Sequence, residues 1–132
     1  MNRKRVAWAL LLLVPLLTAV AAPELSAERN KVVHITIEKS MPSDGSRVSG
    51  VSEVRLFFTG APLLRGASVR IVTANRTLVR SSPPAADGRD PRQLFTTLEA
   101  ALAPGVYVVQ WRCIADDGHV MRGDFRFEVT GD

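Results

Sequence analysis

The chain has 132 residues, of which 46% are hydrophobic, and it carries 17 basic against 13 acidic side chains. This length allows one domain with an N-terminal appendage, and a single cysteine, Cys113, excludes an intramolecular disulfide. Because no basic face with interleaved aromatic residues is recognisable, the composition also argues against nucleic acid as a partner.

Residues 1–21 are predicted to be a secretory signal peptide. Arg3, Lys4 and Arg5 precede the apolar run 6–17, and Ala-Val-Ala at 19–21 is a small-x-small cleavage site. A retained membrane anchor is the alternative. Even if the apolar run is extended to residue 22 it has 17 residues, whereas a spanning helix needs roughly 20. Cleavage removes three of the 17 basic residues and leaves 14 against 13 acidic ones, so the mature chain is nearly neutral.

Residues 22–31 are polar and aperiodic, which predicts a short flexible leader before a domain over 32–132. From there, apolar and polar residues alternate with period two, as in strands with one buried face. The first strand, 33–38, places Ile35 and Ile37 on one face and His34 on the other. A turn is expected at 40–46 and an exposed loop at 81–92. Further strands are expected at 54–59, around Val69 and Ile71, at Leu78 and Val79, and at 94–98. Two more are expected near the C-terminus. One has Tyr107, Val109, Trp111 and Cys113 on one face, and the other has Phe125, Phe127 and Val129 facing inward.

Residues 102–107, Leu-Ala-Pro-Gly-Val-Tyr, resemble the tyrosine corner of Greek-key sandwiches, in which the phenol bonds to upstream backbone. Trp111 would then be the core tryptophan, and Cys113 a small buried hydrophobe. About seven short strands without a sustained helix predict an all-β fold, an immunoglobulin-like Greek-key β-sandwich or barrel.

Asp117 and His119 lie two residues apart, and in an extended backbone their side chains would leave the same face. Together with His34, the only other histidine, they offer two imidazoles and a carboxylate, a set that suits Cu(II) or Zn(II). Two alternatives stay open on the residues alone. Asp-Gly-His is also ordinary solvated turn chemistry, and His34 could be a surface residue of its strand.

A family resemblance bears on these alternatives. Residues 34–46 begin with His and continue into Ser-Met-Pro-Ser-Asp-Gly, which resembles the opening of the CopC family of periplasmic copper-binding proteins. Residues 105–129 contain Gly-x-Tyr-x-Val-x-Trp-Arg, then Ala-Asp-Asp-Gly-His, then Gly-x-Phe-x-Phe-x-Val, and they resemble its C-terminal signature.

The resemblance implies that His34, Asp117 and His119 bind Cu(II) in the periplasm, in an exported carrier or buffer for copper homeostasis or resistance. An inner-membrane copper transport protein is the expected partner, and a monomer is expected. In the family the amine of the first His also binds copper, because that residue is the mature N-terminus. Cleavage after residue 21 would leave twelve residues ahead of His34, so its nitrogen would be a peptide nitrogen and affinity should fall.

Residues 61–66, where some family members carry a methionine-rich loop for Cu(I), contain neither methionine nor histidine, so no Cu(I) role is expected. The alternative function is a CopC-fold interaction domain that has lost tight metal binding. An enzyme is not expected, because the chain offers no general base besides the proposed ligands.

Overall fold

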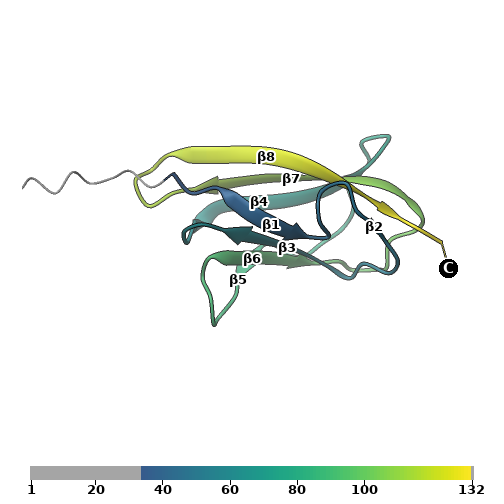
Figure 1. The fold of residues 1–132 in the computed structure, drawn as a ribbon, viewed down its shortest axis with the longest axis horizontal. Coiled ribbons are helices and arrows are strands. Elements are labelled where there is room, and N and C mark those ends of the chain that lie inside the picture. Colours follow the sequence, from purple (N-terminus) through teal and green to yellow (C-terminus); the bar gives the residue numbers. More distant parts are fainter. Residues whose placement is uncertain (1–33, 132) are drawn as a thin grey trace, which may run out of the picture. The chain divides into compact units, whose positions relative to one another are not determined.

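Residues 34–131 of the computed structural model form two four-stranded β-sheets that enclose one core (Figure 1). The first sheet has the order β1-β3-β6-β5 and the second has the order β2-β8-β7-β4. The strands are β1 (Ile37–Met41), β2 (Arg47–Val48), β3 (Glu53–Phe58), β4 (Leu63–Thr73), β5 (Ala85–Ala86), β6 (Gln93–Thr97), β7 (Gly105–Ile114) and β8 (Val120–Val129). The predicted all-β sandwich is confirmed. Within this range no helix could cross a membrane. The predicted signal peptide and leader lie outside the described residues.

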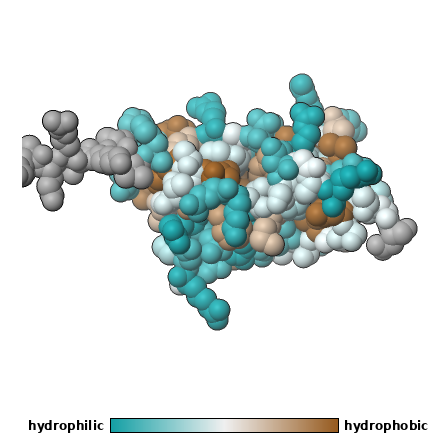
Figure 2. Space-filling model, viewed as in Figure 1, coloured by the Kyte–Doolittle hydropathy of each residue, from teal (hydrophilic) through white to brown (hydrophobic). Residues whose placement is uncertain are grey.

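The core follows the alternation seen in the sequence. In β3, every second residue is buried, and Phe58 is only 1% exposed. The facing strands β7 and β8 contribute Val109 and Phe127 to the same core. Burial of such side chains is the main favourable contribution to folding. Figure 2 shows the complementary pattern outside, where residues of hydrophilic or intermediate hydropathy cover most of the view and hydrophobic patches are small and separate.

Trp111 differs from its predicted role as the central core tryptophan, because it is only half-buried at the border of the core. Its ring meets Phe58 edge to face, with the ring centroids 5.6 Å apart. On its other side it covers Gly123, the residue directly opposite on β8. A Cβ atom at Gly123 would lie 2.8 Å from Trp111 Cζ2, so the indole occupies space that only a glycine leaves free.

The tyrosine corner is confirmed. The Tyr107 hydroxyl donates a hydrogen bond to the Ala103 carbonyl at 2.7 Å, and the ring is buried against Phe127 with the centroids 5.7 Å apart. This bond ties the connection after β6 to the start of β7. Cys113 is fully buried on the same strand, as predicted, and burial raises the pKa of its thiol to about 11.

Tyr107→Phe should destabilise the domain by about 1 kcal/mol, because it removes this hydrogen bond and keeps the ring. Because Ala103 is an exposed residue, water can replace the phenol at its carbonyl, which limits the loss. Urea denaturation would measure the effect as a lower midpoint with an unchanged slope. An unchanged midpoint would mean that the corner does not contribute to stability.

Several boundaries differ from those predicted. The pairing in β1 begins at Ile37, later than the predicted strand at 33–38, and an irregularity in register follows Ile37. Leu78 and Val79 form no strand; Leu78 makes one isolated bridge to Val72 and is 53% exposed. The expected loop 81–92 contains the short strand β5, which pairs with β6. These short segments depend on neighbouring strands for their hydrogen bonds, which alternation in the sequence does not reveal.

Candidate metal centre

His34 is placed by the two residues that follow it. Ile35 is 6% exposed and packs close to Gly60, where an added Cβ would lie 3.2 Å from Ile35 Cγ1. Thr36 is held in both directions by Thr59. Its amide donates to Thr59 Oγ1 and its carbonyl accepts from the Thr59 amide, each at 2.9 Å. The opening segment is therefore fixed to the end of β3, and His34 remains exposed beside it.

The sequence did not predict this attachment, because Thr36 and Thr59 look like ordinary polar residues on two separate strands. The bonds between them depend on how β1 and β3 pair, which no local sequence motif predicts.

Asp117 and His119 lie in the tight connection between β7 and β8, not in an extended strand. The Gly118 amide donates to the Ala115 carbonyl and the Ala115 amide to the His119 carbonyl, each at 2.9 Å. Gly118 has φ of +87°, a conformation that glycine adopts without steric cost. Ala115 is buried and anchors the turn. The two side chains are thus brought together by a turn, and the extended backbone that would place them on one face does not occur here.

Asp117 orients the imidazole of His119. One carboxylate oxygen accepts from the His119 amide at 3.0 Å, and the other lies 2.7 Å from His119 Nδ1. These two contacts lower the pKa of Asp117 below its ordinary value, and the bond from the His119 amide has the larger effect. An ionised carboxylate can only accept, so Nδ1 carries a proton and Nε2 is left for another partner. Histidine ligands in metal sites are commonly oriented this way.

The structure brings His34 and His119 together at the same end of the domain. Their ring centroids are 6.2 Å apart and the rings are inclined by 47°. A metal–nitrogen bond of about 2.0 Å and a further ~1.1 Å to the ring centre allow two rings on one ion to have centres up to about 6 Å apart. The observed separation is therefore close to the largest that one shared ion permits.

The donor set fits copper chemically, since imidazole and carboxylate suit Cu(II). As they stand, however, no three His, Cys, Asp or Glu side chains within residues 34–131 are grouped closely enough to hold an ion. The His119 side chain is 67% exposed and Asp117 33%, so both can rotate without disturbing the core. His34 is also exposed, so all three side chains are free to reorient at this end of the domain.

Comparison with known proteins gives one family. The family model described as the CopC domain matches residues 37–130. Copper resistance protein C of Xanthomonas campestris pv. juglandis is 28% identical over 120 residues, covering 85% of this chain and 92% of that protein. Protein YobA of Escherichia coli K12 is 24% identical over 97 residues, covering 73% of this chain and 78% of that protein.

Solved structures share the fold. CopC from Methylosinus trichosporium OB3b superposes with a TM-score of 0.67 at 29% identity, covering 73% of this chain and 93% of that one. PcoC, a methionine-rich copper resistance protein from Escherichia coli, has a TM-score of 0.67 at 22% identity, covering 74% and 99%. The family match includes Asp117 and His119, whereas His34 lies three residues before its first residue.

Proposed function

The chain belongs to the CopC family, and on this premise we propose that it is an exported copper-binding protein that holds Cu(II) through His34, Asp117 and His119. It would serve as a carrier or buffer in copper homeostasis or resistance. Relatives that carry the name copper resistance protein C support this role. The single observation that carries the assignment is the 6.2 Å approach of the only two histidines in the chain.

Cu(II) is favoured over Cu(I) by the ligand types. Cu(I) prefers soft thioether donors, and this chain has only three methionines. Met121 is half-buried and packs against the core, while Met41 is 56% exposed at the end of β1. These two side chains do not make the chain methionine-rich, as PcoC is.

A copper titration tests the proposal directly. Calorimetry should give one Cu(II) per chain, and electron paramagnetic resonance should show nitrogen hyperfine coupling from imidazole. Uptake below one equivalent, with no nitrogen coupling, would instead support the interaction domain that has lost tight metal binding. That alternative is favoured by the absence of a preformed three-ligand cluster among residues 34–131.

Copper binding should weaken below about pH 6, because imidazole binds a metal only in its neutral form. The lowered pKa of Asp117, set mainly by the His119 amide, keeps that carboxylate ionised through this range. Affinity should therefore fall by about tenfold per pH unit for each imidazole that must lose a proton. Calorimetric titrations between pH 7.5 and about 5 would measure the slope. A pH-independent affinity would rule out histidine ligands.

We further infer export to the periplasm through a cleaved N-terminal signal, with an inner-membrane copper transport protein as the partner. The charged, apolar and small-residue segments of residues 1–21 support export. The mass of the purified periplasmic protein would give the mature N-terminus and show whether the His34 amine is free. We propose no enzymatic activity, since the only imidazoles in the chain are the proposed ligands.

A further inference from the structure

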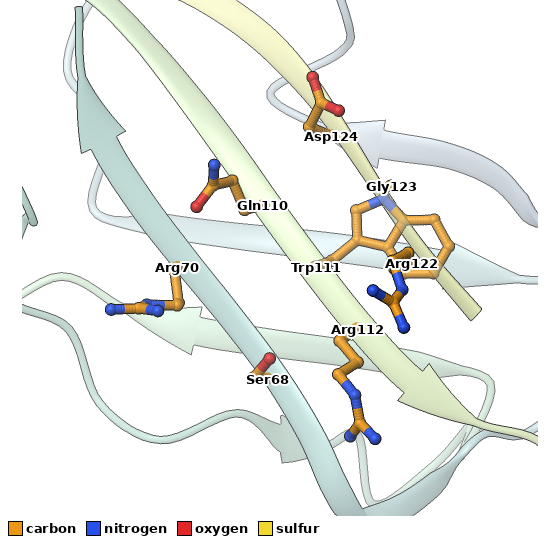
Figure 3. Close-up of a pocket in the computed structure, with 8 residues that line it drawn as sticks. All are labelled: Ser68, Arg70, Gln110, Trp111, Arg112, Arg122, Gly123 and Asp124. Atoms are coloured by element: carbon orange, nitrogen blue, oxygen red, sulfur yellow. The ribbon is translucent and has the colours of Figure 1, made fainter. Parts of the chain in front are cut away.

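The outer face of the second sheet carries a group of arginines. Side chains alternate along β4, β7 and β8, so residues between the buried ones point away from the core. Strand pairing places them in successive rows: Ser68–Arg112–Arg122, then Arg70–Gln110–Asp124, then Val72–Val108–Arg126. Figure 3 shows the first two rows, which border a shallow hollow of about 440 Å³ together with Trp111 and Gly123. We call Arg70, Arg112, Arg122 and Arg126 the arginine face.

The arginine face is not neutralised by its neighbours. Within residues 34–131, none of the four guanidinium groups lies within 4.0 Å of a carboxylate oxygen. Asp44 approaches Arg126 only through the backbone, because the Arg126 amide donates to Asp44 Oδ1 at 3.2 Å. Asp124 is the one acidic residue in these rows, and the nearby Glu128 is already paired with Arg47 at 3.0 Å. The excess is local, because the predicted mature chain has 14 basic and 13 acidic residues.

Two of these arginines face each other directly. Arg112 on β7 and Arg122 on β8 are cross-strand partners, an arrangement in which like charges are destabilising. Arg112 donates one bond to the Gly66 carbonyl at 2.7 Å, which holds the guanidinium in place without removing its charge. A bound anion would relieve this repulsion, and guanidinium groups suit phosphate because they can bind it with two parallel hydrogen bonds.

An apolar row adjoins the arginine face on the same side of the sheet. Leu63, Ile114 and Val120 are paired across β4, β7 and β8, next to the row that holds Arg112 and Arg122. Leu63 is 36% exposed and Val120 43%. This row borders the connection that carries His119, so it lies at the end of the domain where the two histidines meet.

We propose that this surface docks on a membrane containing anionic phospholipids. The arginines are spread over three strands instead of converging on one point, which suits a plane of separate headgroup phosphates. Leu63 and Val120 would contact the boundary between headgroups and acyl chains. Docking in this orientation brings the histidine end of the domain to the membrane. The inference goes beyond copper binding and does not depend on it.

Sedimentation with vesicles tests the docking. Metal-free protein would be mixed with vesicles of phosphatidylglycerol and phosphatidylcholine, or of phosphatidylcholine alone, and the ratio of the two partition coefficients measured. All variants share the N-terminal segment with Arg3, Lys4 and Arg5, so its contribution cancels when the ratio of a variant is compared with that of the wild-type protein. Arg112→Gln with Arg122→Gln should lower the ratio by about 25-fold, taking roughly five-fold per arginine near an anionic surface. Salt at about 0.5 M should also lower it.

Two further pairs keep the test specific. Arg70→Gln with Arg122→Gln retains the Arg112–Gly66 bond and should lower the ratio similarly. The exposed Arg76 and Arg89 lie outside the rows, so Arg76→Gln with Arg89→Gln, the same change in charge, should leave the ratio within about two-fold. Equal losses in all three pairs would overturn the proposal. A wild-type ratio near one would also overturn it, and is the result expected if the surface binds an acidic protein instead of a membrane. Copper titration of the same variants should be unchanged, which separates this outcome from a failure of the copper assignment.

Discussion

Replacing His119 with alanine should weaken Cu(II) binding by about 100-fold or more. The substitution removes one of two imidazoles, and loss of even an outer partner of a metal ligand costs 10–100-fold. It also removes the ring contact to one Asp117 oxygen, whereas the backbone amide of residue 119 keeps its bond to the other. Because His119 is exposed, the fold should be unaffected, and circular dichroism would verify this. Isothermal titration with Cu(II) measures the affinity.

Neighbouring substitutions make this result specific. Asp116 is an exposed carboxylate in the same turn, so Asp116→Ala should leave the affinity unchanged. Asp117→Asn keeps the shape of the side chain and removes its charge, and it should reduce affinity by about 10–100-fold. His34→Ala should match His119→Ala if both rings bind one ion. A His119→Ala protein with wild-type affinity would end the assignment of copper to this site.

The largest effect on stability is expected from Phe58→Ala, which should destabilise the domain by about 4 kcal/mol. Phe58 is 1% exposed at the centre of the core and supports the Trp111 ring edge to face. Its truncation removes buried apolar contact and leaves a cavity between two sheets that cannot collapse freely. Urea denaturation monitored by circular dichroism would measure the change in the free energy of unfolding.

Phe57→Ala is the matched control, because Phe57 is the preceding residue on the opposite face of the same strand. Phe57 is half-buried, and Lys39 Nζ lies 4.4 Å from its ring centroid. Loss of that exposed cation–π contact and some apolar area should cost about 1 kcal/mol. If Phe58→Ala is too unstable to purify, Phe58→Leu should still fold with a smaller loss of about 1.5 kcal/mol. Equal effects at the two positions would contradict the burial pattern.

Much of the fold could be predicted because its signals are local. Alternation along β3 puts Val54, Leu56 and Phe58 in the core, as the structure confirms. The Leu-x-Pro-Gly-x-Tyr segment identified the Tyr107 corner, whose bond spans only four residues. The strands β2 and β5 were not predicted, because two residues are too few to show a period. The partner of β2 is also distant in the sequence, since Arg47 pairs with Glu128.

The candidate site likewise has one part that local sequence predicts and one part that depends on distant contacts. By itself, the sequence determined that a carboxylate and an imidazole stand two residues apart around Gly118, since a turn of this kind forms from contacts within itself. Only the tertiary structure decided that His34 lies beside His119, although they are far apart along the chain. Their approach depends on the packing of the two sheets and on the bonds between Thr36 and Thr59. The arginine face is decided in the same way, because the register of β7 on β8, and not the spacing along either strand, sets Arg112 opposite Arg122.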